Sequence, residues 1–214
     1  LDSDDAKAVL DELGEDSDAE TVRDVAERLR DYALEDEDDR EMAERLFNSY
    51  NGHTGNEDSQ LLALIVAAER GEGDARQIGL PDADRKTWSD FKREEIEAAA
   101  RAYHKDRAVT ERVLRKRFGD QAPPLYRGIN SKELAELVKD GPAQIEWLKM
   151  RSVNSFSESR AIAADYGDVV IAASGVRIED VVASPYTHAP FSELAEFVVW
   201  QPETGSYMAE KSGE

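Results

Sequence analysis

The chain of 214 residues contains no cysteine, few aromatic side chains and no long apolar run. Without cysteine, disulfide bonds and thiolate chemistry are excluded. The three histidines, His53, His104 and His188, are far apart and show no metal-ligand spacing, so no metal is expected. No stretch approaches the roughly 18 apolar residues of a membrane span, so no membrane partner is expected.

Basic residues are also scarce: 27 Lys and Arg stand against 47 Asp and Glu, which gives a net charge of −20. The excess negative charges repel one another at ordinary salt, and high salt screens that repulsion. We therefore expect a halophilic acidic surface, in the cytoplasm of a salt-accumulating host or in a virion; an ordinary acidic soluble protein is the alternative. A nucleic-acid partner is not expected, because the basic run at 112–117 follows a helical pattern that is typical of a solvated face.

The sequence opens on Leu1 rather than Met and shows no basic or apolar leader. We expect no signal peptide, and a start that is processed or truncated upstream.

The first half predicts helices joined by acidic turns. Ser17 and Glu20 form the pattern of a capping box at the start of a helix. The acidic cluster at 35–40 predicts a loop, with a short helix at 42–50 after it. A further helix at 59–69 is apolar on most sides, so we expect it at the centre of the packing.

A long helical pattern runs from Thr87 to Phe118. From Pro124 onward, short apolar runs replace it. The predicted strands are 125–129, 153–157, 169–173, 176–178, 180–183, 196–200 and 206–209, with helices at 131–139 and 158–166 between them. The fold class is therefore α+β: a helical N-terminal region (1–80), then a mixed, mostly antiparallel, β-rich domain (81–214) with its core at 124–209.

Arg127 lies within the predicted strand Leu125-Tyr126-Arg127-Gly128. A guanidinium offers five donors in a planar fork that fits phosphate oxygens, and Gly128 allows a ligand to approach the backbone closely. A surface arginine paired with one of the many carboxylates is the alternative.

Ser155-Phe156-Ser157 ends a predicted strand just before a helix. Alternation places Ser155 and Ser157 on one face, where their hydroxyls can meet a ligand, while Phe156 anchors the core. Ser157 can instead cap the following helix.

Glu196 opens the apolar strand Phe197-Val198-Val199-Trp200. A carboxylate at the start of a buried strand is unfavourable unless it has partners, so Glu196 is more informative than most of the acids. A solvent-facing strand end is the alternative.

These three segments, in this order, resemble the arginine, serine and glutamate signature of the mono-ADP-ribosyltransferases. The resemblance covers roughly 124–209, including the alanine-rich segment after the serines and the closing pair of short strands. It implies an ADP-ribosyltransferase-like fold and cleavage of NAD, as a substrate, between nicotinamide and ribose. It also implies that Glu196 and Ser155 are catalytic, and that Arg127, Gly128, Phe156 and Ser157 bind NAD.

The resemblance also implies that the loop before Glu196 contacts a protein acceptor of ADP-ribose, through Tyr186, Phe191 and Glu193. Members that modify arginine carry an acid two residues before the catalytic glutamate, where this chain has Leu194. Glu193 lies on the other face of a regular strand, so it replaces that acid only if a bulge or turn intervenes. The acceptor is therefore left open, and water is one candidate.

Two readings of function follow. The first is an NAD-dependent mono-ADP-ribosyltransferase that modifies a protein, which could be toxin-like and carried by a virion. The second is a virion structural or head-associated viral protein that bears this fold with little or no activity and contacts other virion proteins. A bland α+β domain whose three segments do not converge is the remaining alternative.

Overall fold

The computed structural model describes the chain except for residues 15, 51–55, 78–79, 131–150, 201–207 and 212–214. The helices are α1 (Asp4–Asp11), α2 (Ala19–Ala33), α3 (Glu37–Tyr50), α4 (Glu57–Glu69), α5 (Arg93–Phe118) and α7 (Arg160–Ala164). The strands are β1 (Leu125–Ile129), β2 (Val153–Ser157), β3 (Val169–Ala173), β4 (Val181–Ala183), β5 (Glu196–Trp200) and β6 (Met208–Lys211). The α+β class is thus confirmed, with most helices before the strands. The helix expected at 131–139 lies outside the described residues.

The helix starts follow local charge and capping. Asp18, not Ser17, is the N-cap of α2, where its side chain accepts from the Thr21 amide at 2.8 Å. The acidic cluster expected to be a loop belongs largely to α3, whose first turn holds Glu37, Asp38 and Asp39. Carboxylates at this end are stabilised by the helix dipole, which explains why the prediction of a loop was wrong.

The six strands form one sheet in the order β4-β5-β2-β1-β3-β6, and every pair is antiparallel. The strands expected at 125–129, 153–157, 169–173 and 196–200 are confirmed with the predicted bounds. The segment 176–178 is not a strand, because it makes only an isolated bridge at Arg177 and leads into the 3-10 turn Ile178–Asp180.

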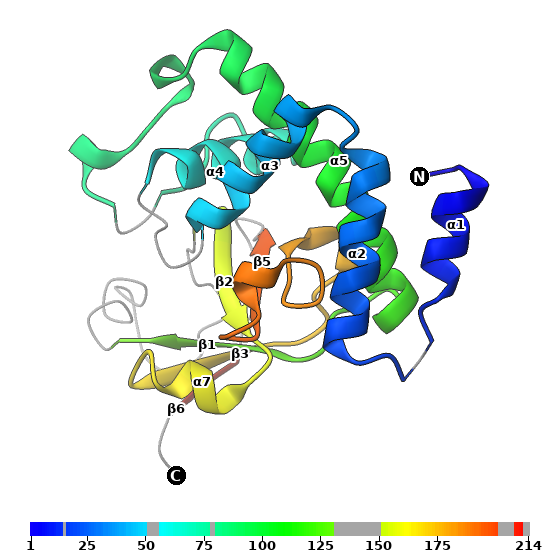
Figure 1. Cartoon of the computed structure of the whole chain (residues 1–214). Coiled ribbons are helices and arrows are strands. Elements are labelled where there is room, and N and C mark those ends of the chain that lie inside the picture. The colour runs from blue at the N-terminus through cyan, green and yellow to red at the C-terminus, as the bar shows by residue number, and fades with distance from the viewer. Residues whose placement is uncertain (15, 51–55, 78–79, 131–150, 201–207, 212–214) are drawn as a thin grey trace.

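The sheet has two halves that meet at β1 and β2. These strands share one register pair, Tyr126 opposite Ser157, whereas β1 pairs with β3, and β2 with β5, along five residues each. Figure 1 shows β2 and β5 running in a different direction from β1, β3 and β6. The junction of the two halves is therefore a place where side chains from three strands can approach one another.

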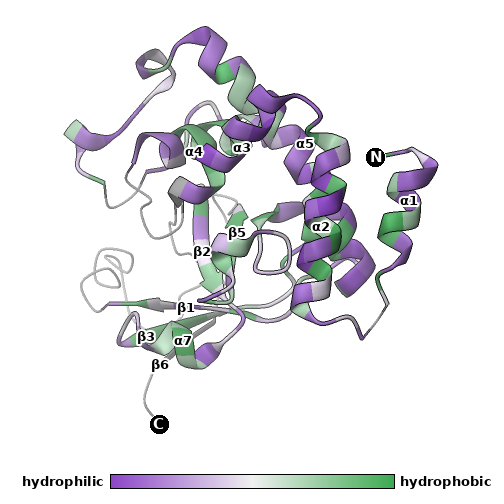
Figure 2. Cartoon of the chain, in the orientation of Figure 1, coloured by the Kyte–Doolittle hydropathy of each residue, from purple (hydrophilic) through white to green (hydrophobic). Residues whose placement is uncertain are grey.

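One of the three hydrophobic clusters joins the helices to the sheet. A single cluster joins Leu46 of α3, Leu62 of α4 and Tyr103 of α5 to Val153 of β2 and Val198 of β5. Eight residues of α4 are buried, so the prediction that it is central is confirmed. In Figure 2 apolar residues gather on α4 and the strands, and hydrophilic ones cover the outer helices. The boundary expected near residue 80 therefore does not separate two cores.

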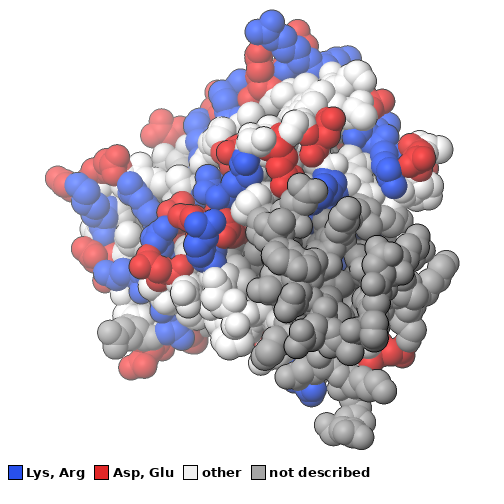
Figure 3. Space-filling model, turned by 180° about the vertical axis from the view of Figure 1, so that it is seen from behind, with Lys and Arg blue, Asp and Glu red and all other residues white. Residues whose placement is uncertain are grey.

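The basic run at 112–117 is occupied by intramolecular ion pairs. Arg112 pairs with Asp2, and Lys116 with Asp11, which ties α1 to α5, while Arg115 contacts Glu111 and Asp120. Figure 3 shows acidic and basic side chains intermixed over the described part of the face that it presents. The run thus serves the packing of α1 and carries no separate basic stripe.

Candidate active site

The three segments singled out in the sequence lie on adjacent strands. β2 stands between β1, which carries Arg127, and β5, which carries Glu196. In the β2–β5 register, Ser157 lies opposite Glu196 and Ser155 opposite Val198. Sequence order alone does not place these strands side by side, so their convergence is a result of the fold.

Arg127 reaches across from β1 to β2. Its Nη1 donates to the backbone carbonyl of Ser155 at 3.0 Å, which fixes the plane of the guanidinium beside the serine. Burial raises the pKa of Glu196, and the positive charge of Arg127 opposes that rise. The cation, the hydroxyl and the carboxylate are therefore electrostatic neighbours.

Glu196 is only 8% exposed. Burial raises the pKa of Glu196, and a hydrogen bond from Ser155 and the charge of Arg127 oppose that rise without cancelling it. A carboxylate that is buried, and only partly compensated, is a frequent feature of functional sites.

The two serines have different tasks. Ser155 is half-buried and donates to Glu196. Ser157 donates to the carbonyl of Leu194 at 2.8 Å and accepts from the amide of Ser159 at 3.1 Å. The cap of α7 is Ser159, whose hydroxyl accepts from the Ile162 amide. Ser157 therefore holds the turn before Glu196 in place, whereas Ser155 favours the ionised form of the carboxylate.

A turn, not a regular strand, precedes Glu196. The Ala195 amide bonds to the Ser192 carbonyl at 3.2 Å, and Ala195 has a positive φ of 46°. An L-residue adopts this conformation only when its surroundings require it. Because the turn interrupts alternation, the face argument against Glu193 does not apply; Glu193 is exposed on the turn, and Leu194 is half-buried.

The packing of the chain around position 128 requires a glycine there. A side-chain carbon there would lie 2.0 Å from the carbonyl oxygen of Ala163, so only glycine lets α7 approach β1 this closely. The expected close approach at Gly128 is thus made by the helix that follows the serines.

Phe156, Phe191 and Tyr186 are packed side chains. Phe156 is 2% exposed in the cluster that also holds Phe197, which confirms that it anchors the core and corrects its assignment to NAD binding. Phe191 is fully buried, so in this conformation it cannot contact an acceptor. Tyr186 is half-buried against Phe118 and donates to the carboxylate of Glu158 at 2.9 Å. Burial, together with Glu158, raises the pKa of Tyr186 to about 12.

A second charged cluster was missed in the sequence. Asp106 on α5 is 1% exposed and contacts Arg30 of α2 and His188 of the loop before β5. The signal was present, because Asp106 shares the spacing of the buried Tyr103, Val109 and Val113 along α5. An acid on the apolar face of a helix predicts a buried partner, although not which one.

No protein-family model, curated protein or solved structure matches the chain. Among the residues that the structure describes, no helix has both the length and the apolarity needed to cross a membrane. Within the same residues, no group of three or more His, Asp or Glu side chains is arranged to hold a metal ion.

Proposed function

We propose that the chain is an NAD-dependent mono-ADP-ribosyltransferase that acts at the junction of β1, β2 and β5. The observation that supports this most is the convergence of Arg127, Ser155 and Glu196, which come from three separate segments. Their chemistry suits a ligand with phosphates at one end and a sugar that becomes cationic at the other.

In the proposed reaction the bond between nicotinamide nitrogen and ribose C1′ breaks, and nicotinamide leaves with the electron pair. The ribose becomes an oxocarbenium ion, which an acceptor nucleophile attacks at C1′ with loss of its proton. Glu196, ionised, stabilises the cationic sugar, and Ser155 orients the carboxylate. Arg127 binds the phosphates. One well-placed charge of this kind lowers a barrier by about 3 kcal/mol.

The acceptor is proposed to be a protein side chain next to the turn at 192–195. Glu193 is exposed on this turn, which leads directly to the buried Glu196. Among the described acids it is the nearest in sequence to Glu196. If no acceptor is present, water takes that place and the products are nicotinamide and ADP-ribose.

The test is release of nicotinamide from NAD in molar KCl, chosen because of the net charge of −20. Glu196→Gln should lower release by on the order of a hundredfold, and Arg127→Lys should raise KM for NAD because a point charge replaces the bidentate fork. Glu27→Gln, an exposed acid on α2, is the matched control and should retain the wild-type rate. Equal rates for wild type and Glu196→Gln would refute the proposal.

A further inference from the structure

The buried cluster missed in the sequence is a continuous chain of polar groups. Asp106 Oδ2 accepts from Arg30 Nε at 2.5 Å, and Asp106 Oδ1 lies 2.9 Å from His188 Nε2. His188 Nδ1 lies 2.9 Å from the hydroxyl of Thr187, which lies 2.8 Å from that of Ser184. The chain thus runs from helices α2 and α5 into the loop of residues 184–195.

The protonation of this chain follows from its partners. Asp106 only accepts, so His188 Nε2 carries the proton and His188 Nδ1 accepts from Thr187. Burial lowers the pKa of His188, so its ring is neutral and this arrangement persists at ordinary pH. Burial by itself raises the pKa of Asp106, but Arg30 and His188 outweigh it and the pKa is lowered.

α2 holds the backbone of the same loop with two arginines. Arg23 Nη1 donates to the carbonyl of Pro185 at 2.9 Å, and Arg30 Nη2 donates to the carbonyl of Thr187. The two arginines are two helical turns apart and therefore share one face of α2. Because both hydrogen bonds are made to backbone carbonyls, they fix the path of the loop's backbone.

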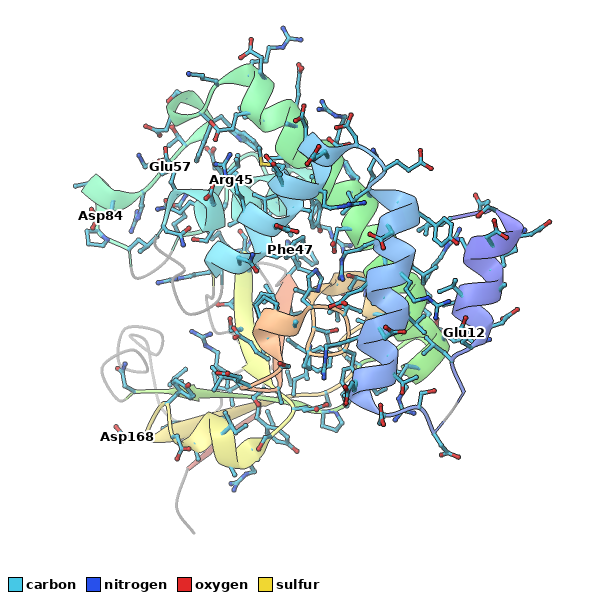
Figure 4. All side chains as sticks on the ribbon, in the orientation of Figure 1. Glu12, Arg45, Phe47, Glu57, Asp84 and Asp168 are labelled. Carbon is cyan, nitrogen blue, oxygen red and sulfur yellow. The ribbon has the colours of Figure 1, made fainter. Side chains whose placement is uncertain are left out.

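Aromatic rings pack against His188, which belongs to this loop. Phe47 of α3 packs on the His188 ring at a centroid distance of 4.4 Å, and Phe191 packs edge-on at 5.9 Å. Figure 4 labels Phe47, which lies between α3 and the β5 region. Asp106 and Thr187 are each 1% exposed and His188 is 6% exposed, so no substrate reaches them. The arrangement resembles a catalytic relay in its bonds, but its burial excludes direct chemistry.

The far end of this loop delivers Glu196. Leu194 bonds to Ser157 through its carbonyl, and the carbonyl of Ala195 accepts from the amide of Glu158 at 3.1 Å. Between His188 and Glu196 the chain makes only the short turn Ala189–Phe191 and the turn that ends at Ala195. A shift at His188 is therefore transmitted to Glu196 over two tight turns.

We propose that Arg30, Asp106 and His188 are positioning residues, which hold the loop of residues 184–195 so that Glu196 meets Ser155. This positioning role rests on the proposed function. It means that the helical half of the chain helps to place the catalytic groups. A misplacement of a catalytic group by about 1 Å costs on the order of a hundredfold in rate. Binding of the NAD phosphates at Arg127, on β1, does not depend on this loop.

The test uses the full chain with three variants of decreasing severity: Asp106→Asn, Thr187→Val and Arg23→Ala. Thr187→Val keeps the volume and removes the hydroxyl, and Arg23→Ala removes one bond at the rim, so at least one variant keeps its fold. The controls are Asp39→Asn, at a buried acid of α3 that pairs with Lys105 and Arg101 and not with the loop, and Arg28→Ala, at a residue that pairs with Glu12, the C-cap of α1.

We expect kcat for nicotinamide release to fall ten- to a hundredfold in Asp106→Asn and about tenfold in Thr187→Val. KM should stay within about twofold, and both controls should retain wild-type constants. Faster hydrogen exchange of the amides at 192–196 should accompany the loss. Unchanged kcat in a variant that keeps its fold overturns the proposal, and so does a fall in kcat that Asp39→Asn reproduces.

Hydrogen exchange separates this proposal from the proposed function. If the wild type releases no nicotinamide, the proposed function fails, and the exchange of the 192–196 amides alone decides whether the network sets the place of Glu196. Faster exchange there in Thr187→Val and Arg23→Ala supports the positioning role. Wild-type exchange in both variants overturns it.

Discussion

Two clusters in this molecule combine a cation, a hydroxyl and a buried carboxylate, and they differ in how fully the carboxylate is compensated. Asp106 has Arg30 on one oxygen, and His188 and Thr110 on the other, and its pKa is lowered. Glu196 is buried almost as well, but burial outweighs its partners and its pKa is raised. The first cluster is satisfied and closed, whereas the second holds an acid whose charge is costly.

This difference supports the proposed assignment of the chemistry to the Glu196 cluster. A carboxylate that its own protein already neutralises gains little from a cationic ligand or transition state. A carboxylate that burial has made unfavourable gains much from a positive charge placed beside it. The argument supports the proposal that Glu196 is the reacting acid and Asp106 a positioning residue, although residue types alone would rank them equally.

The largest effect expected is the loss of stability in Asp106→Asn. The variant leaves Arg30 facing a neutral amide in a buried place, and breaking one partner of such a pair costs about 3 to 5 kcal/mol. Urea unfolding at fixed salt measures it. Asp39→Asn should cost less than about 1 kcal/mol, because its partners Lys105 and Arg101 are 39% and 58% exposed and return to water. Equal losses in the two variants would show that the buried Asp106 cluster contributes no more to stability than a pair with exposed cations.

Glu196→Gln should show the opposite pattern. Its free energy of unfolding should stay within about 1 kcal/mol of wild type or rise, because the change removes an unfavourable buried charge. Nicotinamide release should fall by on the order of a hundredfold, equivalent to about 3 kcal/mol of lost transition-state stabilisation. A strongly destabilised variant would show that Glu196 is structural after all.

The response of stability to acid is the third and smaller effect. The pKa of His188 is lowered from 6.5 by burial, so below about pH 6.5 the unfolded chain takes up a proton that the folded one refuses. Stability is therefore fully present above that pH and falls as the pH drops below it, by at most about 1.4 kcal/mol per pH unit. His188→Gln should flatten this segment of the curve. Asp106 does not contribute to this change, because its pKa is lowered and its own effect on stability is confined to pH values below 3.8.

Much of the fold was predictable from local pattern. The strands that carry Arg127, Ser155 and Glu196 are short segments that combine polar residues with β-branched or aromatic ones, which favour strands. The error at α3 has a local cause too, since Asp disfavours the interior of a helix yet favours its first turn. In both cases the decisive interactions lie within a few residues.

What the sequence did not predict depends on pairings between distant segments. The placement of β5 beside β2 is a property of the whole sheet, and Asp106 meets His188 only because α5 packs under the loop. The role of Gly128 was misjudged for the same reason, because the group that approaches it is the carbonyl of Ala163. Ala195 carries no sequence signal for a positive φ, since its conformation is imposed by the turn around it.

The smallest effect, and the sharpest test of the comparison, is the pH dependence of catalysis in Ser155→Ala. Burial raises the pKa of Glu196, and the Ser155 hydroxyl opposes that rise by donating to the ionised form. Glu196 must be ionised to stabilise a cation, so kcat/KM should fall as the pH drops through this raised pKa. Removing the hydroxyl raises the pKa further and should move the acid limb of the profile to higher pH.

Ser157→Ala is the matched control, because it removes the neighbouring hydroxyl of the same strand. That hydroxyl donates to Leu194 and not to Glu196, so its loss should lower the rate by loosening the turn and leave the acid limb where it is. The two serines then separate into one that tunes the charge of Glu196 and one that fixes its place. An acid limb that stays put in Ser155→Ala, or moves in Ser157→Ala, would show that the division of tasks between them is wrong.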